Sequence, residues 1–87
     1  MYYVYAIYNK KHKKIYIGQT KDLDLRIKLH NTHEFKSCYT NRFDGIWELF
    51  YKEEHDSRNK VLIREKQLKS YHGREYLKNL ISPVAQR

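Results

Sequence analysis

Two side chains one helical turn apart and one carboxylate among apolar neighbours are the sequence features best suited to chemistry. Arg26 and His30 would reach the same place if residues 23–30 form a helix. Glu65 would project from the middle of the apolar face of a later helix. An isolated buried charge is expensive, so Glu65 must be ion-paired, protonated or bound to a cation. A guanidinium can bind phosphate oxygens and a carboxylate can hold a hard metal ion, so these residue types are compatible with phosphate chemistry.

The charge of the chain favours a polyanionic partner. It has 18 Lys and Arg against 10 Asp and Glu, a formal net charge of +8 and a pI near 9.6. Cations that neutralise phosphates release counterions, so nucleic acid is the leading candidate, although a basic soluble protein without such a partner stays possible. The candidate phosphate contacts are Lys14, Lys21, Arg26, Lys66 and Lys69.

Length and composition indicate one globular domain spanning residues 1–87. A chain of 87 residues has a thin core, and 40% apolar with 32% charged residues is not a disordered composition. Cys38 is the sole cysteine, which excludes an intrachain disulfide and fits a reducing compartment. No leader-like or membrane-spanning apolar run is visible, so we expect a cytoplasmic protein without a membrane partner.

Three strands are expected. Residues 2–8 and 15–17 are rich in aromatic and β-branched types and flank a polar run, which predicts a β-hairpin. A third strand is predicted at residues 46–51, ending before Glu53. The intervening residues 32–45 have no clear period and are expected to form a loop.

Three helices complete the prediction. Residues 23–30 alternate as a strand would, but Thr20 or Asp22 can cap a helix there, so we predict a helix. Asp56 or Ser57 would cap a second helix running to about residue 70. Its apolar face would be formed by Val61, Leu62 and Leu68.

Gly73 is expected to separate the second helix from a third at residues 74–81. One face of this third helix would carry the apolar residues Tyr76, Leu77, Leu80 and Ile81.

An ordered set of motifs resembles the GIY-YIG nucleases. Ala6-Ile7-Tyr8 and Tyr16-Ile17-Gly18 resemble the paired tripeptides that name the family, with Ala6 where the name has Gly. The likeness continues in order through Gln19-Thr20, Arg26, His30 and Arg64-Glu65-Lys66. It covers essentially the whole chain and is strongest to the small stand-alone bacterial members.

This resemblance implies an α+β fold with a three-stranded antiparallel sheet, made of the N-terminal hairpin plus one strand, flanked by about three helices. It also implies a metal-dependent endonuclease that leaves a 5′-phosphate and a 3′-hydroxyl, using one Mg²⁺ or Mn²⁺. Glu65 would hold the metal and Arg26 would bind the phosphate. The implied substrate is nucleic acid, DNA in preference to RNA, and the sequence itself does not distinguish the two.

The resemblance also assigns roles to the tyrosines. Tyr8 is expected to activate water, with His30 as helper or alternative base, and Tyr16 would orient water or phosphate. Tyr8 and Tyr16 share a face of the sheet only if the hairpin pairs residues whose numbers sum to an even value, which the sequence leaves open. Asn79 is the candidate for a late supporting asparagine.

Plainer interpretations remain for each residue. Tyr8 and Tyr16 could pack the core, Arg26 could face solvent, and Glu65 could form a structural salt bridge. The alternative function is a catalytically weak or inactive nucleic-acid-binding module of the same fold, and a third is an interaction protein with no nucleic-acid role. A monomer and a homodimer are both compatible with the sequence.

Overall fold

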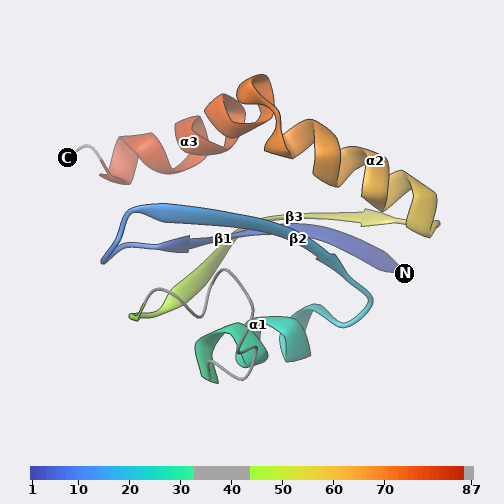
Figure 1. The fold of residues 1–87 in the computed structure, drawn as a ribbon, viewed down its shortest axis with the longest axis horizontal. Coiled ribbons are helices and arrows are strands. Elements are labelled where there is room, and N and C mark those ends of the chain that lie inside the picture. Colours follow the sequence, from blue (N-terminus) through green and yellow to red (C-terminus); the bar gives the residue numbers. More distant parts are fainter. Residues whose placement is uncertain (33–43, 86–87) are drawn as a thin grey trace.

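The fold is a three-layer arrangement in which a sheet separates one helix from two others (Figure 1). The computed structural model describes residues 1–32 and 44–85, so most of the predicted loop, with Cys38, lies outside the described residues. The elements in chain order are β1 (Tyr2–Asn9), β2 (Lys14–Thr20), α1 (Leu23–Thr32), β3 (Trp47–His55), α2 (Arg58–Lys69) and α3 (Tyr71–Ala85). The predicted α+β class with a three-stranded antiparallel sheet is confirmed.

The sheet has the order β2-β1-β3, so β1 is central and β2 is an edge strand. In the β1–β2 hairpin, partners run from Tyr3 with Thr20 to Asn9 with Lys14, and the residue numbers of every pair sum to an odd value. Since side chains alternate along a strand, this register decides which residues share a face.

Each face of the sheet carries its own apolar cluster. On the α2–α3 face, the buried residues are Val4, Ala6, Ile17, Val61, Leu68 and Leu77. On the α1 face, Tyr5, Ile7, Leu23 and Trp47 are buried, with Tyr16 and Ile27 packed against them. β1 is therefore apolar on both faces, which explains why its sequence is nearly continuous in apolar residues.

α1 forms despite its alternating sequence because its start is capped. The Asp22 carboxylate accepts a hydrogen bond from the Leu25 amide at 3.1 Å, so Asp22 rather than Thr20 is the N-cap. Leu23 is buried and Ile27 packs beside it, whereas Leu25 is 51% exposed. Capping and one apolar stripe thus outweigh the strand-like period.

β3 continues past the predicted end because Glu53 anchors it to α2. The Glu53 carboxylate accepts a hydrogen bond from Nε of Arg64 at 2.7 Å and another from the Tyr51 hydroxyl. The strand therefore runs to His55 instead of ending before Glu53. With Arg64 directed at β3, the next residue of α2, Glu65, points in a different direction around the helix.

The boundary between α2 and α3 differs from the prediction. Ser57 caps α2 as predicted, accepting from the Lys60 amide at 3.3 Å, but α2 ends at Lys69 and Ser70 forms the C-cap. Gly73 lies inside α3, where an added Cβ would sit 2.3 Å from the carbonyl oxygen of Gln67. Gly73 is thus required for the close approach of the two helices, not for ending one.

The apolar faces of α2 and α3 are narrower than predicted. Val61 and Leu68 are buried, but Leu62 is 40% exposed. On α3, Leu77 is fully buried while Tyr76 and Leu80 remain exposed, because only one stripe of each helix meets the sheet.

We expect Gly73→Ala to lower the free energy of unfolding by about 2 kcal/mol, since the new methyl group would overlap the backbone of α2. The intrinsic helix preference of alanine alone would raise it by about 1 kcal/mol. Urea denaturation measures the difference, with Asn79→Ala on the exposed face of α3 as the control. A stabilised Gly73→Ala protein would show that the helix corner is not tightly packed.

Candidate active site

A buried cluster of two tyrosines and a histidine lies between the sheet and α1. The Tyr5 hydroxyl and Nε2 of His30 are 2.8 Å apart, a buried hydrogen bond between β1 and α1. The ring of Tyr16, from β2, lies 4.9 Å from that of His30 and 6.3 Å from that of Tyr5, measured between centroids. Tyr5 and His30 are 1% and 2% exposed, whereas Tyr16 is only half-buried. Of the three rings, Tyr16 has the greatest access to solvent.

Gly18 makes room for this cluster. It is the partner of Tyr5 across the hairpin. An added Cβ would lie 2.8 Å from the Tyr5 hydroxyl oxygen and 3.0 Å from the ring of Tyr16. Real Cβ atoms do not approach so closely, so glycine at this position allows the two tyrosines to pack over β2.

His30 is held neutral by its surroundings. Burial, and then the positive charge of Arg26 one turn earlier on α1, lower its pKa from 6.5 to about 4. A neutral imidazole can accept the hydrogen bond of the Tyr5 hydroxyl at physiological pH. Arg26 itself is half-buried, so it lies at the margin of the cluster.

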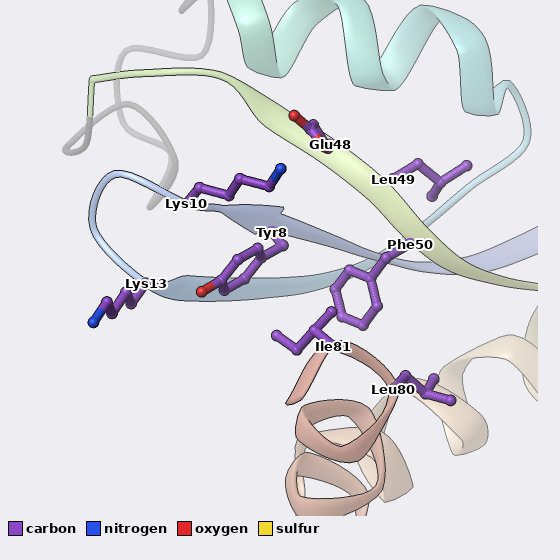
Figure 2. Close-up of a pocket in the computed structure, with 8 residues that line it drawn as sticks. All are labelled: Tyr8, Lys10, Lys13, Glu48, Leu49, Phe50, Leu80 and Ile81. Atoms are coloured by element: carbon purple, nitrogen blue, oxygen red, sulfur yellow. The ribbon is translucent and has the colours of Figure 1, made fainter. Parts of the chain in front are cut away.

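Tyr8 lies outside the cluster, contrary to the prediction. It pairs with Ile15, and the odd register places its side chain on the α2–α3 face, opposite to Tyr16. There Tyr8 lines a cavity of about 540 Å³ with Phe50 and Ile81, as Figure 2 shows. The condition for Tyr8 and Tyr16 to share a face is not met, so Tyr8 cannot act with Tyr16 and His30.

Glu65 also lies apart from the cluster, on the helix layer opposite to α1 (Figure 1). Its side chain is 20% exposed and its carboxylate is 3.4 Å from Nζ of Lys69. Lys69 and Arg74 line a hollow of about 310 Å³ together with Tyr16. The two layers therefore meet at the free edge of β2, where the exposed side of the cluster faces the end of α2.

The carboxylate of Glu65 could bind one hard cation whose other ligands would be water and substrate. Within residues 1–32 and 44–85, no three His, Cys, Asp or Glu side chains gather into a metal cage. Mg²⁺ is commonly held by one or two carboxylates, with water and substrate phosphates completing its shell. A single partly exposed carboxylate such as Glu65 fits that arrangement, and no preformed site of several protein ligands is needed.

The other predicted residues are spread over the surface. Lys14 and Lys66 are exposed, on β2 and α2. The ammonium of Lys21 lies 5.1 Å from the ring centre of Tyr2, near the far end of β2. Asn79 is exposed on α3, on the layer opposite to the cluster.

Comparison with known proteins identifies the family. The family model of the GIY-YIG catalytic domain matches residues 1–79. The chain belongs to the GIY-YIG family. The solution NMR structure of the UPF0213 protein BH0048 from Bacillus halodurans is similar, with a TM-score of 0.54 and 30% identity over 92% of this chain and 85% of that one. None of the curated proteins matches the chain.

Family membership confirms the resemblance and the fold expected from it. GIY-YIG is a nuclease family, and such a domain implies a nucleic-acid substrate. None of the helices in the described part of the chain combines the length and apolar character needed to span a membrane.

Sequence reasoning missed Tyr5 and Gly18 as partners in the site. The tyrosine that meets Tyr16-Ile17-Gly18 across the hairpin ends the tripeptide Tyr3-Val4-Tyr5, not Ala6-Ile7-Tyr8. The signal that distinguishes them is the length of the hairpin loop, which sets the parity of the pairing.

The buried state of His30 makes stability depend on pH. Its folded pKa of about 4 lies below the ordinary 6.5, so between these values the unfolded chain binds a proton that the native protein excludes. Stability is complete above pH 6.5 and falls as the pH drops towards 4, by about 3 kcal/mol for this group.

Urea denaturation from pH 7 to pH 4 measures this dependence, and proton NMR reports the His30 titration directly. The His30→Gln protein should have a lower free energy of unfolding at pH 7, and that free energy should change less between pH 7 and pH 4. The His72→Gln protein, changed at an exposed position, should show the same pH dependence of stability as the wild type. A His30 signal that titrates near 6.5 would contradict the buried neutral state.

Proposed function

We propose that the chain is a divalent-metal-dependent endonuclease that acts on DNA rather than RNA and leaves a 5′-phosphate and a 3′-hydroxyl. The observation that carries the proposal is the buried Tyr5–His30 hydrogen bond beside Tyr16, whose ring borders the same hollow as Lys69, the ion-pair partner of Glu65. A compartment such as the cytoplasm, where Mg²⁺ and nucleic acid are both present, would suit this activity.

Arg26 and Tyr16 are the groups placed to meet substrate. Both are half-buried, so each has one side fixed by packing and another towards solvent. The planar guanidinium of Arg26 can bind two non-bridging oxygens of a phosphate at once. The hydroxyl of Tyr16 can orient the attacking water or accept its proton.

The Tyr5–His30 pair acts as a positioning device. A general base works best when its pKa is near the working pH, so an imidazole with a pKa of about 4 is a weak one at pH 7. Because His30 stays neutral, its Nε2 can accept from the Tyr5 hydroxyl, and this hydrogen bond holds the Tyr5 ring against Tyr16. Tyr5, at 1% exposure, is too deep to reach a substrate phosphate.

The metal would be held by a Glu65 carboxylate oxygen. When bound, a divalent cation supplies Lewis-acid polarisation of the phosphate and lowers the pKa of bound water. Lys69, now paired with Glu65, would have to release the carboxylate and could then bind the substrate backbone.

That same ion pair favours the second candidate, a nucleic-acid-binding module with weak or no turnover. An ammonium 3.4 Å from the carboxylate competes with a metal ion for the same oxygen. The module would bind DNA in a salt-dependent manner and leave it intact.

Cleavage assays distinguish the two candidates. Supercoiled plasmid and branched, single-stranded or RNA oligonucleotides would be incubated with Mg²⁺, Mn²⁺ or EDTA. We expect cleavage with either metal, loss in EDTA, and at least a 100-fold loss of kcat in Glu65→Gln. Glu54→Gln, an exposed carboxylate on β3, is the matched control and should retain activity. Cutting that survives EDTA or the Glu65 change would exclude the proposed metal role.

Three tyrosine-to-phenylalanine changes test the site geometry. Each removes one hydroxyl and leaves the ring. Tyr16→Phe should lower kcat about 100-fold, the usual scale for a proton-handling group. Tyr5→Phe should lower kcat less, about 10-fold, because it only loosens the positioning of Tyr16. The dependence of kcat on pH should change little. Tyr8→Phe should stay within about twofold, since Tyr8 lies across the sheet; equal losses for Tyr8 and Tyr16 would refute the assignment.

A further inference from the structure

Two hollows line the free edge of β2 and join into one basic strip. The first is lined by Ile15, Tyr16, Ile17, Lys69 and Arg74. The second, of about 190 Å³, is lined by Lys13, Lys14, Ile15, Arg74 and Lys78. They share Ile15 and Arg74, and no acidic residue is among these lining residues. The strip begins at the exposed side of Tyr16 and extends to the tip of the hairpin.

Arg74 is the centre of the strip because it lines both hollows, and its side chain is held in place. Its Nε donates to the carbonyl oxygen of Lys69 at 3.0 Å, and its amide donates to the carbonyl oxygen of Ser70 at 2.9 Å. Among the described residues, the two terminal nitrogens of its guanidinium have no hydrogen-bond partner. A guanidinium held through Nε with its other nitrogens open is already arranged to bind phosphate oxygens.

The basic side chains at the tip of the hairpin differ in their surroundings: some pair with a carboxylate, and one lines the strip. Lys11 forms an ion pair with Asp44, and Nε2 of His12 lies 2.6 Å from the same carboxylate. Lys13 instead lines the second hollow, and it does so with φ of +55°, a conformation that a lysine adopts at an energetic cost. A strained lysine where asparagine or glycine would be easier suggests that its charge has a use.

The acidic groups near the strip are few and paired. Glu65 lies 3.4 Å from Lys69, and Glu75 lies 3.8 Å from Lys78, a loose contact on the exposed face of α3. Within the described part of the chain, neither carboxylate forms an ion pair with Arg74, so Arg74 and Lys13 keep their charge for a ligand.

We propose that this strip is a phosphate track that binds the backbone of one nucleic-acid strand on one side of the cleaved bond, with Arg74 as its central contact. The five hairpin residues that line the strip, 13–17, span about 16 Å, room for two or three consecutive phosphates. The inference rests on the proposed function for its substrate class. It adds Arg74, Lys13 and Lys78 to the binding surface, and a fixed direction for the strand, along β2 from Tyr16 to the hairpin tip.

Binding in EDTA tests the track without turnover. Fluorescence anisotropy with a labelled single-stranded DNA oligonucleotide gives the dissociation constant as a function of salt. Arg74→Ala should weaken binding about 5- to 10-fold and reduce the slope of log K against log salt by about 0.7. Arg58→Ala removes the same charge from the opposite end of α2 and should change binding by less than about twofold. Equal effects of the two variants would overturn the proposal.

A second variant covers the case in which Arg74→Ala disturbs the helix corner. Lys13→Asn removes a charge from the strip, and asparagine tolerates the positive φ better than lysine. The melting temperature should be equal to or above that of the wild type, while binding weakens about threefold. Unchanged binding by a folded Lys13→Asn protein would exclude this end of the track.

The outcomes separate the track from the nuclease proposal. Wild-type protein that binds DNA through Arg74 but cuts nothing would support the track and refute the nuclease. Protein that cuts DNA while Arg74→Ala binds normally would refute the track and leave the nuclease standing.

Discussion

The register of the β1–β2 hairpin is the constraint on which the site depends, and Asn9 helps to fix it. Asn9 is fully buried at the end of β1. Its side-chain oxygen accepts from the amide of His12 at 3.1 Å, and its side-chain nitrogen donates to the carbonyl oxygen of Asp44 at 2.9 Å. These hydrogen bonds fix the conformation of the loop and the point at which strand pairing ends. A shift of one residue would turn every side chain of β2 over and separate Tyr16 from Tyr5 and His30.

The elements of the fold were predictable because each has a local cause, whereas the composition of the site was not. The helix caps Asp22 and Ser57 act on residues close to them in the sequence, and the strands are marked by their own aromatic composition. The parity of the hairpin depends on the loop length and on a contact with Asp44, far along the chain. The choice of Tyr5 over Tyr8 therefore needed coordinates. The same holds for Gly73, whose role depends on how closely two helices approach.

The edge position of β2 explains how residues from opposite layers can serve one reaction. A sheet is a barrier between its faces, and α1 and α2 lie on different sides of it (Figure 1). Only at an unpaired edge can a ligand touch both faces at once. The hollow shared by Tyr16 and Lys69 lies at that edge. A nucleic-acid strand following this edge would also cover the open backbone groups of β2, which a bare edge strand leaves exposed.

The neutral state of His30 connects the stability of the fold with the charge of the site. A protonated His30 would be a buried cation beside Arg26, so burial and that neighbouring charge both oppose protonation. Excluding the proton leaves Nε2 able to accept from the Tyr5 hydroxyl and leaves the half-buried Arg26 as the charged neighbour of the cluster on α1. Acid would therefore weaken the packing of α1 and the placement of the tyrosines through one and the same protonation, which makes the buried imidazole a structural part of the site rather than its base.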